Sequence, residues 1–166
     1  MARIWKVPAR HGSVPNAYTK AGAEEGIEVY IFMPEGMEIS EEVLCRLGVR
    51  SKRGVDLRQL KSLYGLKQAG RMCNQLLIDI LIKLGYKQYY TDSCSYYKHD
   101  EQGTTIVGVY VDDLLVTATS NDRVDAFCFA ERQCLELKDL DQVTNVLGIH
   151  FEYGNACGFW TRSRLS

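Results

Sequence analysis

The alternation of apolar and polar positions predicts a mixture of helices and strands along the chain. Residues 71–84 carry apolar side chains at helical spacing, and Gly85 follows as a stop signal. A second helix is expected within residues 120–137, after N-cap candidates at its start. Strand-like runs cover residues 29–33, 93–98, 104–110, 114–119 and 146–154. This order of elements predicts an α+β fold in which helices pack on an antiparallel sheet.

Two adjacent carboxylates interrupt the clearest pair of predicted strands. Asp112 and Asp113 lie in the sequence GVYVDDLLV, where only VDD separates the two strands, so a tight hairpin with the carboxylates at its tip is expected. A hairpin tip lifts the two like charges out of the apolar layer, where their repulsion would be strongest. Such a pair suits Mg²⁺, which binds carboxylate and phosphate oxygens. The alternative is a polar turn without chemistry, because Asp is a common turn residue.

The composition is that of an ordinary globular domain. The chain has 166 residues, of which 46% are hydrophobic and 25% are charged. The first residues lack the apolar segment of a signal peptide, and no apolar run is long enough to span a bilayer, so we expect an intracellular protein. The six cysteines show no metal-ligand spacing, which predicts reduced thiols without disulfides or structural zinc.

The net charge of −1 conceals a separation of charges along the chain. Residues 24–42 contain seven glutamates and no basic residue, whereas residues 46–71 contain eight Lys or Arg and one acid, Asp56. The basic segment is a candidate phosphate-binding stripe, since Lys and Arg supply much of the affinity for polyanions. A solvated surface loop is an equally good interpretation.

The tetrapeptide YVDD between two hydrophobic strands resembles the catalytic hairpin of reverse transcriptases. Five further segments stand in the same order in the reverse transcriptase domain of Ty1/copia-type retrotransposons. They are VPNAYTKA (14–21), MPEGM (33–37), LKSLYGLKQAGRMCNQLL (60–77), LGYKQYYTDSCSYYK (84–98) and LKDLDQVTNVLGI (137–149). The resemblance covers nearly the whole chain and identifies it as a member of that family.

The resemblance implies a right-hand polymerase, of which residues 1–166 would form a single domain: a palm-like antiparallel sheet with helices on one face, and part of the fingers. The implied reaction is the RNA- or DNA-templated addition of deoxynucleotides to a primer, with two Mg²⁺ as cofactors. The implied partners are therefore template-primer nucleic acid and dNTP, in the cytoplasm or a virus-like particle. By the same resemblance the chain would be truncated at both ends, without the upstream fingers, most of the thumb and the other polyprotein parts.

Site residues carry over position by position from the family. Asp112 would be the metal-binding carboxylate of the hairpin and Asp113 its supporting neighbour, with Tyr110 beside the primer terminus. Tyr18 matches the aromatic residue that selects deoxynucleotides, and Gln68 matches a glutamine that lines the nucleotide pocket. The segment that supports the primer corresponds to Leu147, Gly148 and Ile149. For Tyr18, Tyr110, Leu147 and Ile149 the alternative is ordinary packing in the core.

One departure from the family affects the chemistry. The third carboxylate of the family lies five residues before the selecting tyrosine, and here that position is Ser13. A neutral hydroxyl is a poor Mg²⁺ ligand, so we expect weakened metal binding and a rate lower by several orders of magnitude. Gly70 and Cys73 replace a proline and a tryptophan that are usual in the family, which loosens packing only.

Three hypotheses follow from the sequence. The first is a reverse transcriptase domain that is inactive or nearly so. The second is a non-catalytic palm-like relic that at most binds nucleic acid through residues 46–71. The third, an unrelated metal enzyme built on the Asp-Asp hairpin, would need another acidic ligand that converges on Asp112.

Overall fold

The structure is a computed structural model that describes residues 9–146, 149–154 and 157–162. The chain forms two compact units. We call Met1–Ala17 with Cys73–Ser166 the sheet unit, and Tyr18–Met72 the insert unit. Each is described by itself.

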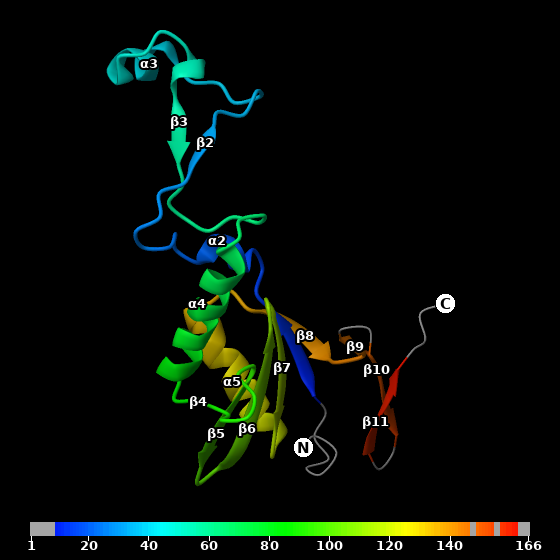
Figure 1. The fold of residues 1–166 in the computed structure, drawn as a ribbon. Helices are drawn as coiled ribbons and strands as arrows, with labels where there is room; N and C mark the ends of the chain where they lie inside the picture. Colours follow the sequence, from blue (N-terminus) through cyan, green and yellow to red (C-terminus); the bar gives the residue numbers. More distant parts are fainter. Residues whose placement is uncertain (1–8, 147–148, 155–156, 163–166) are drawn as a thin grey trace. The chain divides into compact units, whose positions relative to one another are not determined.

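The sheet unit is built on a six-stranded antiparallel sheet with the strand order β4-β5-β6-β7-β1-β8 (Figure 1). Its strands are β1 (Arg10–Ser13), β4 (Lys87–Gln88), β5 (Ser95–Asp100), β6 (Gly103–Tyr110), β7 (Asp113–Ala118) and β8 (Lys138–Gln142). The strands predicted at 93–98, 104–110 and 114–119 are confirmed as β5, β6 and β7. The predicted α+β class is confirmed as well.

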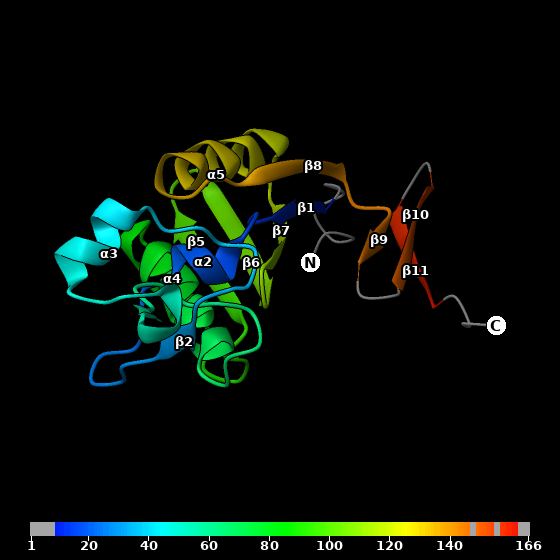
Figure 2. The same cartoon turned by 90° about the horizontal axis from the view of Figure 1, so that it is seen from above.

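Side chains alternate between the two faces of the sheet. In β6 and β7 every second side chain is buried, namely Thr105, Val107, Val109, Leu114, Val116 and Ala118. Helix α5 (Asn121–Cys134) lies along this sheet in both views (Figures 1 and 2), and its Arg123 donates to the Thr105 hydroxyl. Helix α4 (Ala69–Lys83) buries Cys73, Leu77, Ile80 and Leu81. Both helices occur where the sequence predicted them, α4 from its apolar periodicity and α5 after its N-cap candidates.

A smaller sheet follows β8. It contains β9 (Asn145–Val146), β10 (Ile149–Gly154) and β11 (Cys157–Arg162) in the order β11-β10-β9. Phe151 packs with Ala9 and Val143 in a small core that also contacts Leu115 of β7. The last predicted strand, at 146–154, therefore corresponds mainly to β10. Leu147 and Gly148 lie outside the described residues.

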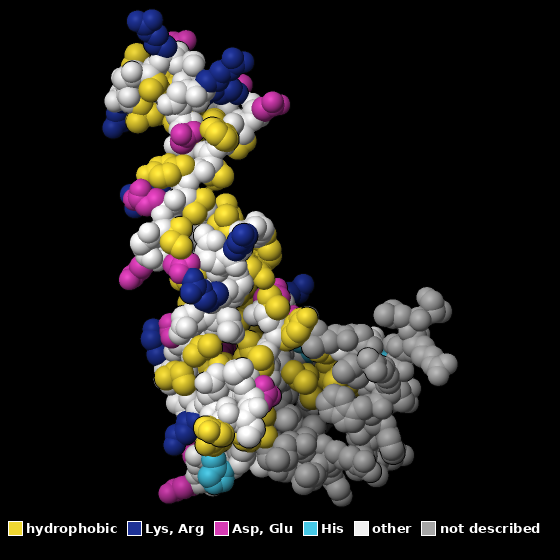
Figure 3. Space-filling model, viewed as in Figure 1, with side chains coloured by type: hydrophobic (Ala, Val, Ile, Leu, Met, Phe, Trp, Pro, Cys, Tyr) yellow, Lys and Arg dark blue, Asp and Glu magenta, His cyan; other side chains and the backbone are white. Residues whose placement is uncertain are grey.

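The insert unit has a two-stranded sheet of β2 (Tyr30–Phe32) and β3 (Asp56–Arg58), which confirms the strand expected at 29–33. Its helical segments are α3 (Glu41–Leu47) and the 3₁₀ turn η1 (Lys52–Gly54), and the short helix α2 (Ala17–Lys20) leads into it. Helix α3 buries no side chain, and all three residues of β2 are exposed. The exposed apolar residues of this unit include Tyr30, Ile31, Phe32, Val43 and Leu47. Figure 3 shows apolar side chains of this unit at the surface, next to charged ones.

Candidate active site

The aspartate pair lies at the tip of the β6–β7 hairpin. Strand β6 ends at Tyr110, which pairs directly with Asp113, the first residue of β7, so the turn consists of Val111 and Asp112. Val111 has a φ of 57°, a value that favours glycine at the first central position of such a turn. A β-branched residue is strained in this region of conformational space. The hairpin predicted from the sequence is confirmed, and the backbone at Val111 in its turn is strained.

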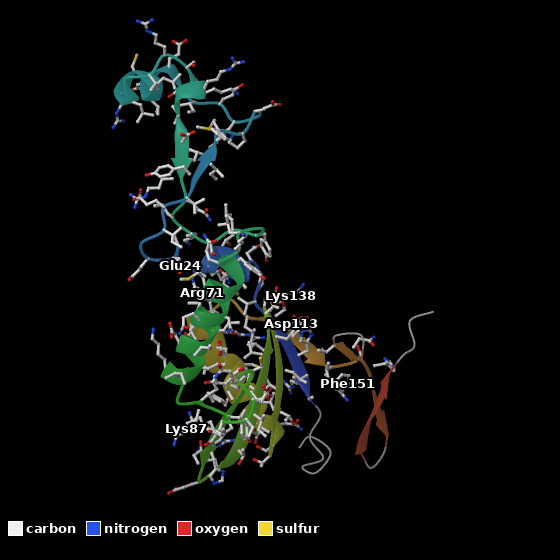
Figure 4. All side chains as sticks on the ribbon, in the orientation of Figure 1. Glu24, Arg71, Lys87, Asp113, Lys138 and Phe151 are labelled. Atoms are coloured by element: carbon white, nitrogen blue, oxygen red, sulfur yellow. The ribbon has the colours of Figure 1, made fainter. Side chains whose placement is uncertain are left out.

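Next to this tip, four side chains on neighbouring strands form a row across the sheet. Ser13 of β1 is paired with Asp113 on one side and with Lys138 of β8 on the other. Directly opposed residues of antiparallel strands point to the same face, so Tyr110, Asp113, Ser13 and Lys138 share one face. Figure 4 shows Asp113 and Lys138 at the same end of the sheet. The Val14 amide also donates to the Asp112 carbonyl at 3.0 Å.

His11 adds a nitrogen donor to this face, because it lies two residues before Ser13 on the same strand. Its Nε2 is 2.9 Å from Oδ1 of Asp113, and the two side chains are 18% and 32% exposed. The Nε2 atom is buried and, among the described residues, makes no contact with the angle of a hydrogen bond. Sequence reasoning missed His11, and its only signal was the two-residue spacing from Ser13.

Asp112 is close enough to Cys73 for its charge to affect the thiol. Burial raises the pKa of Cys73, and the negative charge of Asp112 raises that pKa further. Cys73 therefore stays a neutral thiol at pH 7, and a neutral thiol is not the form of cysteine that binds metals. The oxygen donors at the hairpin tip are thus Asp112, Asp113 and the Ser13 hydroxyl.

These residues fit a pair of Mg²⁺ ions poorly. Within the part of the chain that the structure describes, no three His, Cys, Asp or Glu side chains converge to hold a metal ion. Mg²⁺ requires oxygen ligands in near-octahedral geometry, and a second ion requires shared carboxylates. Here the position opposite Asp113 is a neutral serine, and the groups beside it are an imidazole and a lysine.

The other predicted site residues are distributed as follows. Tyr110 is 57% exposed at the end of β6. Tyr18 and Gln68 belong to the insert unit, where the Tyr18 ring lies 4.3 Å from the Tyr64 ring at an interplanar angle of 39°. Gln68 lines a small cavity of about 10 Å³. Leu147 and Gly148 lie outside the described residues.

Three cations of the basic segment have partners inside the insert unit. Arg58 forms an ion pair with Glu28 at 2.9 Å, Arg71 pairs with Glu24 (Figure 4), and the Lys52 ammonium donates to the Glu35 carbonyl. Five further cations are exposed, and their side chains have neither an ion pair nor a hydrogen bond with the described residues. They are Arg46, Arg50, Arg53, Lys61 and Lys67. Both sequence interpretations of this segment therefore describe part of it.

Residues 3–159 match the family described as "Reverse transcriptase (RNA-dependent DNA polymerase)". The chain belongs to this family. The reverse transcriptase sequence is 29% identical over 139 residues to "Retrovirus-related Pol polyprotein from transposon TNT 1-94" of Nicotiana tabacum, a match that covers 82% of this chain and 9% of that protein. It is 33% identical over 88 residues to "Putative transposon Ty5-1 protein" of Saccharomyces cerevisiae, covering 53% of this chain and 29% of that protein. The predicted membership in the Ty1/copia-type reverse transcriptases is confirmed.

The chain spans less than a third of either relative's length. No solved structure matches it. Among the described residues, no helix combines the length and the apolar character that a membrane crossing requires.

Proposed function

We propose that this chain is the palm, with part of the fingers, of a retrotransposon reverse transcriptase, and that it is catalytically defective. By family, the activity is template-directed addition of deoxynucleotides to a primer, with Mg²⁺ ions supplying the electrostatic stabilisation of phosphoryl transfer. Template-primer, dNTP and the rest of a Pol polyprotein are the partners, inside the cell or a virus-like particle. The roles assigned to Asp112, Asp113, Tyr110, Tyr18 and Gln68 belong to this proposal.

The observation that carries the proposed defect is the pairing of Ser13 with Asp113. A carboxylate at position 13 would stand beside Asp113, on the face that also carries Tyr110. The serine supplies a neutral oxygen instead of a shared anionic ligand. Removing one preorganised electrostatic group from an enzyme costs about 10²–10³-fold in kcat, and a shared metal ligand belongs in that range or above it.

A chimera tests the proposal without requiring the isolated chain to be complete. Residues 3–159 replace the matching segment of the tobacco TNT 1-94 polyprotein, and primer extension is measured in Mg²⁺ for the chimera with Ser13 and with Ser13→Asp. We expect Ser13→Asp to extend the primer at least about 10²-fold faster. Ser13→Asn is the matched control, because asparagine has the size of aspartate without its charge.

Three outcomes would contradict the proposal. Equal extension by the Ser13 and Ser13→Asp chimeras would show that serine is tolerated. Recovery with Ser13→Asn would attribute the effect to side-chain size. Silence of Ser13→Asp, with the unmodified tobacco protein active in the same assay, would move the defect elsewhere in the chain.

A second candidate function is nucleic-acid binding without catalysis, and the five exposed, unpaired cations of the insert unit favour it. If all five contact phosphates of a single strand, a plot of log affinity against log salt has a slope of about −3.5. Filter binding with the double variant Arg50→Gln/Arg53→Gln should reduce the magnitude of that slope by about 1.4. A flat salt response would remove this function.

A further inference from the structure

Three buried oxygens of the insert unit belong to residues that surround one small cavity. Oε2 of Glu24, Oε1 of Gln59 and Oγ of Ser62 are buried and have no hydrogen-bond partner among the described residues. All three residues line the same cavity, whose volume is about 10 Å³. We propose that one water molecule binds in this cavity as a fixed part of the insert unit, hydrogen-bonded to all three oxygens.

The cavity occurs where the pairing of two chain segments changes register. Gly22 pairs with Lys61. Tyr30 of β2 pairs with Arg58 of β3, so the chain advances eight residues on one side and three on the other. The surplus residues form a bulge, and the two backbones do not close the space beside it. The cavity is lined from both sides, by Ala23, Glu24, Ile27 and Val29 of the bulge and by Gln59 and Ser62 opposite them.

The three oxygens offer the partners that a water molecule requires. The Glu24 carboxylate and the Gln59 carbonyl oxygen accept hydrogen bonds, and the Ser62 hydroxyl can donate one. A water that donates twice and accepts once pairs all of these groups. Its size fits as well, since one water needs a cavity of about 10–15 Å³ with two to four polar partners. The water thereby removes the cost of three buried polar atoms without partners.

The charge of the lining favours water over a cation. Of the described residues that line the cavity, Glu24 alone is charged. Its other oxygen, Oε1, already pairs with Arg71 (Figure 4). A cation would therefore meet one carboxylate that Arg71 already compensates and two neutral oxygens, whereas a water needs no further charge.

The water has a consequence for Gln68, which lines the same cavity. The side-chain amide of Gln68 is a donor that could otherwise turn towards the oxygens of Glu24 and Gln59. With those oxygens bonded to water, the amide stays available to a ligand. The water site is independent of the proposed function. Only this consequence rests on it, because the proposed function places Gln68 in the nucleotide pocket.

The direction of the stability change in Ser62→Ala tests the inference. Ser62 is 2% exposed, so its hydroxyl depends on partners inside the protein. The readout is hydrogen exchange of the Gln59 amide, which donates to the Val29 carbonyl at 2.9 Å and reports on the insert unit itself. If water bridges the three oxygens, alanine takes a donor from it, and the protection of this amide should fall about fivefold. If the hydroxyl has no partner, alanine removes an unsatisfied group, and protection should rise. A rise or an unchanged protection would overturn the inference.

The matched control is Thr117→Val in β7. The Thr117 hydroxyl is also buried without a partner among the described residues, but Thr117 does not line this cavity. Its removal should therefore not lower the protection of the β7 amides. A fivefold loss in both variants would show that the loss of any buried hydroxyl has this effect, which would also overturn the inference.

A crystal structure of the unaltered 166-residue chain gives a direct test. It should show one ordered water within about 2.7–3.2 Å of the oxygens of Glu24, Gln59 and Ser62. A Gln68 amide bonded to Glu24 or Gln59 in place of the water would overturn the inference. Three oxygens too far apart to share one water would do the same.

The two proposals fail separately. Neither hydrogen exchange in Ser62→Ala nor the crystal structure depends on primer extension by the chimera with Ser13→Asp. A chimera restored by Ser13→Asp, together with higher protection in Ser62→Ala, would leave the proposed function standing and remove the water site alone. A silent chimera with the water present would do the reverse.

Discussion

Glu131 of α5 is fully buried, and its environment gives the folded state a defined dependence on pH. Neither carboxylate oxygen has a hydrogen-bond partner among the described residues. Burial raises the pKa of Glu131 from 4.5 to about 7. The protonated form is therefore the one that the folded chain accommodates, and ionisation in place costs free energy.

The sign and size of the effect follow from proton linkage. Below pH 4.5 the group is protonated in both the folded and the unfolded chain, so it has no effect. Between pH 4.5 and about 7 only the unfolded chain ionises, and the free energy of unfolding falls by about 1.4 kcal/mol per pH unit. Above pH 7 the loss levels off at about 3 kcal/mol.

Glu131→Gln should remove this loss, because an amide does not ionise. We expect the variant to unfold with a free energy up to about 3 kcal/mol above wild type at pH 8, with a much smaller difference at pH 4.5. Urea unfolding followed by circular dichroism across this pH range measures it. Glu101→Gln, which removes an exposed glutamate from the β5–β6 turn, is the control and should keep the wild-type slope. Parallel pH profiles for wild type and Glu131→Gln would refute the reasoning.

Two further predictions concern the sheet unit. Val111→Gly should raise the free energy of unfolding by about 1 kcal/mol, since relief of about 1–3 kcal/mol of backbone strain exceeds the entropy cost of glycine; a less stable variant in thermal unfolding would show that the Val111 side chain packs usefully. Arg123→Gln should lower it by about 1–2 kcal/mol, because Arg123 bonds both oxygens of Asp100, at 2.6 and 3.1 Å, and the Thr105 hydroxyl. Arg123 also lowers the pKa of Asp100. The pairing therefore stabilises the fold above the usual Asp pKa of 3.8, and this stabilisation is lost as the pH falls through the lower pKa of the folded state. Acid unfolding of Arg123→Gln should lack this loss, and an acid transition equal to that of the wild type would contradict the assignment.

The elements that sequence analysis predicted are those with a local signal. Helix α4 has an apolar stripe and a glycine stop, and the β6–β7 hairpin has two alternating strands around a two-residue turn. Strand β3 and helix α3 were not predicted; both bury almost nothing, and the Ser40 cap and the Gly48 stop that bound α3 were not used. Strand β8 is largely polar, and its place beside β1 depends on pairing between distant residues.

The residues of the candidate site also differ in whether they have a local sequence signal. Asp112 and Asp113 were identified from the hairpin pattern, and Ser13 from the spacing of the family motif. Their meeting depends on the pairing of β1 with β7, which joins residues about a hundred positions apart and leaves no local trace. His11 was missed for this reason, since a lone histidine in a polar run gains meaning only from the strand opposite it.

The pairing of Ser13 with Asp113 also bears on how such a fold persists. Like charges directly opposed across two strands destabilise a sheet, so an aspartate at position 13 would act against folding while serving a metal. Serine removes that repulsion and accepts hydrogen bonds. Once activity is no longer selected, replacement of aspartate by serine at position 13 carries no cost in stability that would oppose it. Under the proposed function, the sheet keeps its stability after the carboxylate is lost, because Ser13 places no like charge opposite Asp113.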